Sequence, residues 1–279
     1  MVDTNNTIER AAELIAEADA IVITAGAGIG VDSGLPDFRG KAGFWRAYPM
    51  LKRKHLSFYE MASPEMFEKN PELAWGFYGQ RLNLYRETEP HEGFSILKRW
   101  AYKMPAGYFI STSNVDGQFQ KAGFDKNRIV EIHGSIHHVQ TLSGSNNEIL
   151  CAKNINVTVN PETLLAENLP YHTETNELLR PNILMFGDWQ WLGGRAENQV
   201  NIMNAWIDKI KAQHAKVVII ELGAGSDIAT VRYNSIALRD RLLGKLIQIN
   251  PKPGNTANIV LKLGALEALQ AIDKLLTRN

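Results

Sequence analysis

Three short segments of this chain carry residue types that could do chemistry together. They are a glycine-rich turn at residues 26–30, a polar segment at residues 113–116, and His133, which is followed by a glycine. Histidine has an unperturbed pKa of about 6.5 and is therefore the usual general base near neutral pH. Glycines after a strand let backbone N–H groups approach a diphosphate at a helix start. The combination predicts a dinucleotide-binding site next to a histidine.

Short apolar runs predict the elements that must position these segments. Runs of β-branched and other apolar residues, typical of buried parallel strands, lie at residues 20–24, 107–111, 128–132, 216–222, 246–249 and 259–263. Helical segments separate most of them, and helical spacing also marks residues 7–18 and 265–276. The alternation predicts an α/β fold, a Rossmann-like, mostly parallel sheet with helices on both faces. Each of the three segments follows a predicted strand, at the edge where such sheets bind ligands.

Two stretches interrupt this alternation. Residues 44–100 are rich in aromatic and helix-forming residues and show no strand signal, whereas residues 134–181 are polar with little periodicity. They predict a helical insert and an irregular insert with a small β-ribbon. We therefore expect a Rossmann-like NAD-binding domain from residues 1–43, 101–133 and 182–279. A smaller domain is expected from residues 44–100 and 134–181.

Composition narrows the class of protein. The 30 basic residues balance the 30 acidic ones, so no electrostatic footprint for nucleic acid is present. The single cysteine, Cys151, excludes an internal disulfide and favours a reducing compartment. Neither a signal peptide nor an apolar run of about 18–20 residues is evident, so we expect a soluble, cytoplasmic protein without a membrane partner. The pattern does not predict an oligomeric state.

The residues after the glycine turn argue against hydride transfer. A dehydrogenase usually has an acidic residue about 20 positions on, at the end of the next strand. Here the turn is followed by Asp37, Phe38 and Arg39 in a loop bounded by proline and glycine, and then by the helical insert. A surface turn with a local ion pair is the alternative interpretation. The pattern favours cleavage of NAD as a reagent.

Residues 26–39 resemble the signature of the sirtuins, NAD-dependent protein deacylases with Gly-Ala-Gly-Ile-Ser and then Ser-Gly-Ile-Pro-Asp-Phe-Arg. The likeness continues, in order and spacing, at residues 63–65, 70–71, 112–116, 133–134, 179–183, 186–188, 223, 249–250 and 263–264. The resemblance implies NAD as cofactor and an acylated-lysine peptide or protein as substrate. The reaction it implies breaks the nicotinamide–ribose bond and transfers the acyl group to ADP-ribose.

The resemblance also implies roles for individual residues. His133 would deprotonate a ribose hydroxyl, Asn114 would hydrogen-bond the ribose or position water, and Asp116 would accept from the nicotinamide carboxamide. The cofactor-binding set that it implies is Gly26, Ala27, Gly28, Asp37, Phe38, Arg39, Ser113, Asn114, Asp116, Gly223 and Asn250. From the residues alone, His133 could merely cap its strand, and residues 114–116 could form an Asx turn that caps a helix over residues 115–122.

Two further motifs concern the substrate. Tyr78 and Arg81 match a Tyr-x-x-Arg pattern that resembles the acidic-acyl pocket of desuccinylase-type sirtuins, and positions i and i+3 share one helix face. A core tyrosine beside a solvated arginine is the alternative. Phe186 and Gly187 could present backbone to which an extended peptide adds as a strand.

The chain departs from the sirtuin pattern in three places. Ser113 stands where glutamine is usual, and Gly223 is followed by residues without the usual two hydroxyls. The paired cysteines of the family's structural zinc site are missing, so we predict no metal. Because of these departures, two alternatives stay open beside deacylation. One is an ADP-ribosyltransferase or NAD hydrolase on the same scaffold, and the other is a non-catalytic NAD or ADP-ribose sensor.

Overall fold

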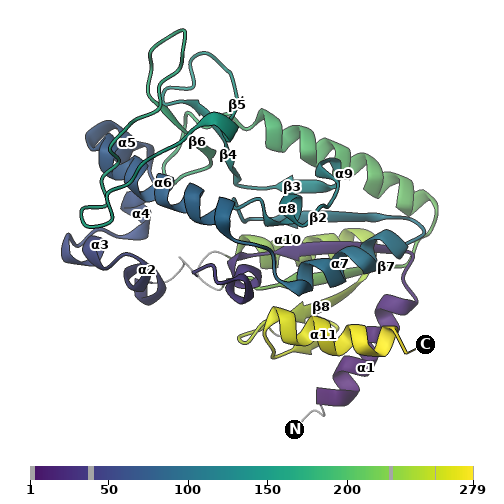
Figure 1. Cartoon of the computed structure of the whole chain (residues 1–279). Helices are drawn as coiled ribbons and strands as arrows, with labels where there is room; N and C mark the ends of the chain where they lie inside the picture. The colour runs from purple at the N-terminus through teal and green to yellow at the C-terminus, as the bar shows by residue number, and fades with distance from the viewer. Residues whose placement is uncertain (1–3, 37–40, 226–228, 255, 279) are drawn as a thin grey trace.

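The central feature of the fold is a six-stranded sheet in which all neighbouring strands are parallel (Figure 1). The structure is a computed structural model and describes residues 4–36, 41–225, 229–254 and 256–278. The strand order is β3-β2-β1-β7-β8-β9. The strands are β1 (Ala20–Ala25), β2 (Tyr108–Thr112), β3 (Ile129–Glu131), β7 (Val217–Leu222), β8 (Lys245–Ile249) and β9 (Ile259–Leu261). The predicted Rossmann-like α/β fold is confirmed.

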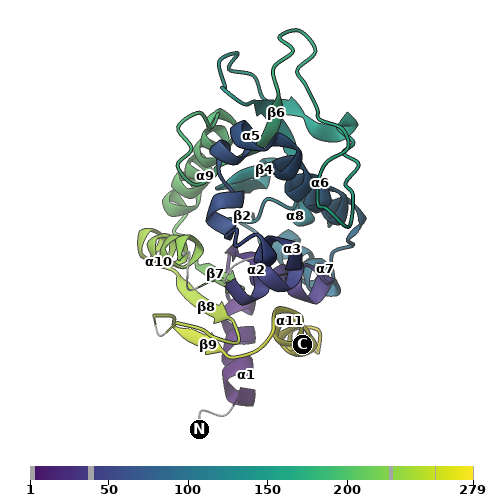
Figure 2. The same ribbon diagram turned by 90° about the vertical axis from the view of Figure 1, so that its left-hand side faces the viewer.

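Helices cover both faces of this sheet because successive strand residues point to opposite sides. In β1, Ile21 and Ile23 belong to one apolar cluster, and Ala20 and Val22 belong to the other. Figure 2 shows α9 and α10 on one side of the sheet and α7 and α11 on the other. Five helices pack on the two faces: α1 (Thr4–Ala16), α7 (Glu92–Lys103), α9 (Gly194–Ala212), α10 (Thr230–Leu242) and α11 (Ala265–Leu276).

A third apolar cluster joins the two inserts. The first insert supplies α2 (Lys41–Ala47), α3 (Pro49–Arg53), α4 (Phe58–Met61), α5 (Pro64–Lys69) and α6 (Pro71–Glu87). The second insert contains β4 (Gly134–Thr141) and β5 (Leu150–Cys151), and β6 (Leu179–Ile183) completes an antiparallel sheet of order β5-β4-β6. The predicted domain boundaries stay a prediction. Most of α7 lies within residues 44–100, yet this helix packs in the apolar cluster of the large sheet.

Side chains of α6 hold the irregular insert. Arg86 donates to the carbonyl oxygens of Ala152 at 2.6 Å and Ile155 at 2.8 Å, and Asn83 Nδ2 donates to Val157 O at 3.1 Å.

Among the residues that the structure describes, no group of three His, Cys, Asp or Glu side chains could hold a metal ion. In the same part of the chain, no helix is long and apolar enough to cross a membrane.

The segment after β2 differs from the prediction. A helix was expected over residues 115–122, but α8 spans only Gln118–Lys121. Gly117 precedes it with a φ of 72°, in the left-handed region that favours glycine, so the chain turns there before the helix begins. The prediction of an Asx turn is confirmed, because Asp116 Oδ1 accepts from the Gln118 N–H at 3.0 Å. The turn leaves Asn114 and Asp116 on a loop.

Candidate active site

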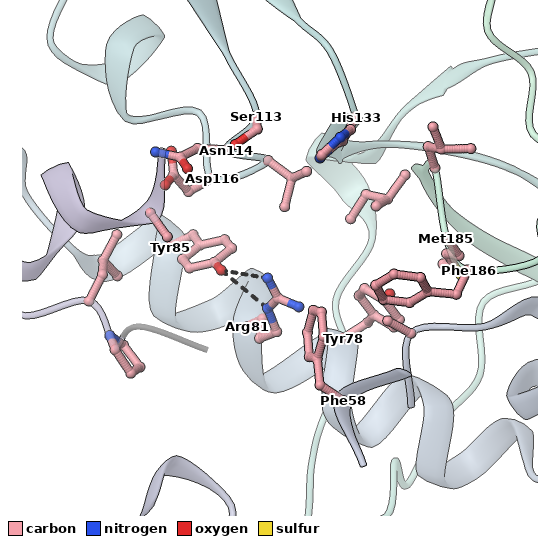
Figure 3. Close-up of a pocket in the computed structure, with 17 residues that line it drawn as sticks. Phe58, Tyr78, Arg81, Tyr85, Ser113, Asn114, Asp116, His133, Met185 and Phe186 are labelled. Atoms are coloured by element: carbon pink, nitrogen blue, oxygen red, sulfur yellow. Dashed lines mark hydrogen bonds between the residues drawn. The ribbon is translucent and has the colours of Figure 1, made fainter. Parts of the chain in front are cut away.

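A cavity of about 270 Å³ lies beyond the carboxyl ends of β1, β2 and β3. The predicted residues that line it are Ala27, Tyr78, Arg81, Ser113, Asn114, Asp116, His133 and Phe186. Figure 3 shows Ser113, Asn114, Asp116 and His133 along one side of this cavity and Tyr78 and Arg81 on the other. We call it the reaction cavity. Packing thus brings residues of the first insert and of the segment at the end of β6 to the same place as the ends of β1, β2 and β3.

The glycine turn and the loop after β7 touch through their backbones. The Gly28 N–H donates to Gly223 O at 3.0 Å, and Gly26 N–H donates to Leu222 O at 2.9 Å. A Cβ added to Gly28 would lie 2.7 Å from the Gly223 Cα, and one added to Gly26 would lie 2.7 Å from Gly223 O. Gly223 itself has a φ of 59°. These glycines are therefore required for the approach of the two loops, in addition to the predicted access for a ligand.

A second cavity, of about 380 Å³, lies along the ends of β1, β7 and β8. The predicted residues Ala27, Gly28, Gly223 and Asn250 line it, and Ala27 also lines the reaction cavity. Asn250 Nδ2 donates to Ala224 O at 2.7 Å and so fixes the loop after β7. We call it the cradle cavity. Two cavities that adjoin at Ala27 suit a long ligand with two parts.

Hydrogen bonds to the neighbouring backbone hold the polar segment after β2 in place. Asn114 Nδ2 donates to Gly26 O at 3.1 Å, which ties this segment to the glycine turn. The Ser113 N–H donates to Ala25 O at 3.1 Å. Burial raises the pKa of the Asp116 carboxyl to about 6. The hydrogen bond that this carboxyl accepts from the Gln118 N–H opposes the shift. Asp116 is therefore a buried carboxyl group that is held rigidly at the cavity wall.

His133 lies between β3 and β4 and lines the reaction cavity. Its carbonyl oxygen accepts from the Leu184 N–H at 3.0 Å. Gly134, with a φ of 76°, follows it, and a Cβ there would lie 2.1 Å from Asn182 O. The glycine thus lets the backbone pass close to β6 directly after the histidine. The imidazole is held at the cavity rather than in the apolar core.

Tyr78 and Arg81 lie on the face of α6 that points into the reaction cavity (Figure 3). Arg81 is only 7% exposed, and its Nε and Nη2 donate to Tyr85 Oη at 3.1 and 2.9 Å. Its guanidinium carbon lies 5.7 Å from the centre of the Tyr78 ring. Burial raises the pKa of Tyr78 to about 12, so its hydroxyl is protonated at neutral pH. The solvated arginine of the alternative interpretation is not what the structure contains.

Phe186 lines the reaction cavity from the loop after β6, and Gly187 follows it with a φ of 65°. Asp188 closes this loop, because its Oδ2 accepts from the Met185 N–H at 3.3 Å and its Oδ1 from the Gln190 N–H at 3.2 Å. Arg180 donates to the same carboxylate at 2.7 and 2.8 Å, and both side chains are fully buried. An ion pair thus fixes the Phe186 loop to β6.

Some predicted residues lie outside the described part of the chain, and some residues of the site were not predicted. Asp37, Phe38 and Arg39 lie outside the described residues. Tyr85 was missed, although its i+4 spacing from Arg81 places it on the same helix face. Cavity-lining residues that the sequence did not single out also include Phe58, Ile183, Leu184 and Met185 in the reaction cavity, and Asp32 and Lys252 in the cradle cavity. Their motif signals are weak, because an isolated apolar residue or surface charge has no distinctive spacing.

Comparisons with known proteins identify the family of this chain. The model of the Sir2 family matches residues 26–220, and the chain therefore belongs to the Sir2 family. An NAD-dependent protein deacylase of Aquifex aeolicus is 36% identical over 60% of this chain and 62% of its own length. One of Thermococcus sibiricus is 29% identical over 95% of this chain and 94% of its own. The predicted sirtuin family is confirmed.

Solved structures support the fold. A crystal structure of a Sir2 homologue in complex with NAD has a TM-score of 0.73 to this chain at 23% identity, and the match covers 100% of this chain and 95% of that one. A Sir2 homologue bound to ADP-ribose has a TM-score of 0.69 at 24% identity and covers 97% and 98% of the two chains. At such low identity these matches establish that the Rossmann-like architecture is shared.

Proposed function

We propose that this chain is an NAD-dependent protein-lysine deacylase that transfers the acyl group to ADP-ribose. The observation that carries the proposal is that His133, Asn114 and Asp116 line one cavity, which adjoins the glycine-lined cradle cavity at Ala27. Family membership and the deacylase relatives support it. An acylated-lysine protein is the proposed substrate. A cytoplasmic location stays a prediction.

The residues present fit NAD. A Cβ at Gly28 or Gly223 would clash with the facing loop, so both positions must be glycine, and no side chain there covers the backbone that a diphosphate would approach. We assign the nucleotide and diphosphate to Gly28, Gly223 and Asn250, and the nicotinamide end to Asp116 and Ser113. When NAD is bound, it supplies a ribose carbon that becomes electrophilic as nicotinamide leaves.

The chain's own residues then do three things. His133 removes a proton from a ribose hydroxyl as the general base, the role that histidine side chains most often take near neutral pH. Asn114, held by Gly26 O, keeps its amide oriented toward the same sugar. The ionised Asp116 carboxylate accepts from the carboxamide NH2. Because hydrogen bonds to the backbone hold the side chains of Asn114 and Asp116, these two need little reorganisation during the reaction.

The far wall of the cavity favours an acidic acyl group. Arg81, buried and held by Tyr85, offers a positive charge at the depth that the acyl end of a lysine side chain would reach. In a buried site, a guanidinium binds a carboxylate more strongly than a neutral acetyl group. We therefore propose a preference for succinyl-type over acetyl lysine. Phe186 and Gly187 would contact the peptide backbone at the cavity entrance.

The presence of serine at position 113 favours a second candidate function. Where most sirtuins have glutamine, this buried serine is shorter and leaves the ribose with one fewer polar contact. With weaker control of the sugar, another acceptor could take the ADP-ribose, either a protein side chain or water. ADP-ribosyltransferase or NAD hydrolase activity is therefore the second candidate.

Incubation of the protein with NAD, with and without acetyl- and succinyl-lysine peptides, separates these functions. O-acyl-ADP-ribose indicates deacylation, labelled protein indicates transfer, and free ADP-ribose without peptide indicates hydrolysis. Intact NAD throughout would leave only the sensor interpretation. We expect O-acyl-ADP-ribose as the main product.

The His133→Ala variant tests the general base. We expect deacylation to fall at least about 100-fold, the lower end of general-base contributions, while NAD affinity stays within about threefold of wild type. NAD affinity is measured by titration calorimetry and deacylation by peptide mass spectrometry. Undiminished deacylation by this variant would exclude His133 as the base.

A further inference from the structure

A third cavity lies behind the wall of the reaction cavity. It has a volume of about 550 Å³ and is bounded by the end of α6, the loop before α8, β4 and α9. Figure 1 shows α8 and β3 beneath α9, and α9 packs on β3 and η2 (Lys126–Arg128). We call it the rear cavity. None of the roles assigned above uses it, although Tyr85 and Asp116 line both it and the reaction cavity.

Only one turn of chain separates the rear cavity from the proposed nicotinamide site. His137 Nε2 lies 2.9 Å from Asp116 O, and a Cβ on Gly117 would lie 2.6 Å from His137 Cδ2. The turn at residues 116–117 therefore rests directly on a ring that faces the rear cavity. A ligand that displaced or fixed His137 would act on the position of Asp116.

The lining of the rear cavity is basic. Arg86, Lys121, Lys126 and Arg195 are four cationic residues of the lining, against the single carboxylate of Asp116. Glu131 pairs with Arg195 and the exposed Glu89 pairs with Lys121, which offsets part of this charge.

The two histidines of the lining add no charge. Burial lowers the pKa of His137, and burial followed by the nearby Arg195 lowers that of His138 to about 4, so both rings are neutral at pH 7. The net charge of the lining residues and their ion-pair partners is therefore positive.

Polar groups that can bind an anion accompany this charge. Gln120, Ser135 and Asn198 line the cavity with amide and hydroxyl donors. Arg195 Nη1 and His138 Nδ1 are buried in the wall and have no hydrogen-bond partner among the described residues. Such groups usually find a partner in a native protein or its ligand. Donors, positive charge and a volume of ligand size therefore occur together here.

We propose that the rear cavity binds a small anion with two or more negative charges, and that the bound anion changes the affinity of the reaction cavity for NAD through His137 and Asp116. Phosphate and carboxylate groups share the chemistry that this lining recognises, namely several oxygen acceptors on one compact charge. A neutral sugar or a monovalent anion lacks that charge. Lys126 is the most suitable residue for a test, because it is exposed at the rim and its loss leaves no buried charge.

Titration calorimetry with inorganic pyrophosphate and, separately, citrate tests the binding. Saturating ADP-ribose is present, so that the proposed dinucleotide site is filled. We expect saturable binding of at least one probe, and at least about fivefold weaker binding by Lys126→Glu, since a charge reversal near the ligand costs roughly 1 kcal/mol. Lys209→Glu, an exposed lysine of α9 outside the lining, is the matched control and should bind as wild type does. Absent binding, or equal binding by both variants, would overturn the site.

The coupling has its own readout. We expect a saturating concentration of the probe that binds to change the KM for NAD at least about twofold in wild type and in Lys209→Glu, and to have a weaker effect in Lys126→Glu. A probe that merely competes at the cradle cavity would raise the KM equally in all three proteins. That result, or an unchanged KM, would overturn the coupling, while the binding would stand on the calorimetry.

Discussion

Burial of the Asp116 carboxyl group reduces the stability of the folded protein at neutral pH. The same carboxyl group is the one that we propose binds the nicotinamide carboxamide. The Asp116 carboxyl group is buried, and its pKa is raised to about 6 from an unfolded value of 3.8. The folded state therefore holds the proton more tightly than the unfolded state between these pH values. Stability falls as the pH rises from about 4 to about 6, and at pH 7 the buried charge costs on the order of 3 kcal/mol.

The Asp116→Asn variant tests this balance. At pH 7.5 we expect its free energy of unfolding to exceed that of wild type by about 3 kcal/mol, because a neutral amide replaces a buried charge. At pH 4, where the wild-type carboxyl is protonated, the two should agree. NAD affinity should fall in the variant at pH 7.5. Urea denaturation at both pH values measures the stabilities, and the exposed Asp208→Asn is the control. A lower stability of Asp116→Asn at pH 7.5 would contradict the account.

Arg81 determines the proposed acyl preference. We expect Arg81→Met to reduce removal of succinyl groups about 30-fold or more, because a buried charge-assisted hydrogen bond contributes roughly 2 kcal/mol. Removal of acetyl groups should change less than about threefold. The ratio of kcat/KM values for matched succinyl and acetyl peptides measures the effect. Equal losses on both peptides would indicate a structural role for Arg81 instead.

At the scale of elements, the loop between β6 and α9 depends on the buried pair of Arg180 and Asp188. Asp188→Asn leaves the Arg180 guanidinium buried without its counter-ion, which is expected to cost about 3–5 kcal/mol of stability. Glu65→Gln breaks the exposed pair with Lys69 and should cost less than about 1 kcal/mol. Chemical denaturation of both variants compares them.

We expect the same pair to position the Phe186 loop for the substrate as well. Because Asp188 closes the loop that carries Phe186, the Asp188→Asn variant should raise the KM for acyl peptide several-fold more than the KM for NAD. A purely structural role would alter both constants alike, or would lower only the amount of active enzyme. Steady-state kinetics at a temperature where the variant is folded distinguishes these outcomes.

At the scale of the whole molecule, α6 holds together the third apolar cluster, which joins the two inserts. Apart from apolar packing, Arg86 and Asn83 bind three carbonyl groups of the irregular insert. We expect a chelator such as EDTA to leave the thermal midpoint unchanged within about 1 °C. Arg86→Met should lower the free energy of unfolding by about 2 kcal/mol, through two lost charge-assisted bonds. A zinc-containing relative treated in parallel is the control, and a fall of the midpoint in EDTA would refute metal independence.

The positions of the strands along the chain and of the functional segments after them could be predicted because they depend on local pattern. Runs such as residues 20–24 and 216–222 are mostly apolar, and every residue of β1 and β7 is buried, as expected for strands covered on both faces. The segments at 26–30, 113–116 and 133 follow such strands directly, so parallel pairing gathers them at one edge. The extent of α8 was not predictable with the same accuracy, because it depends on the left-handed turn at Gly117.

Contacts between distant segments were decided by tertiary packing. The sequence by itself determined the α/β class, the family signature and the identity of His133, Asn114 and Asp116, since strand periodicity and motif spacing are properties of short stretches. Only the packed structure placed Arg81 and Tyr85 opposite His133, seated Gly28 against Gly223 and enclosed a basic cavity behind Asp116. The physical reason is that each of these arrangements joins segments far apart in the sequence, such as the loops after β1 and β7 or the elements α6, β4 and α9, and no local pattern encodes how they pack.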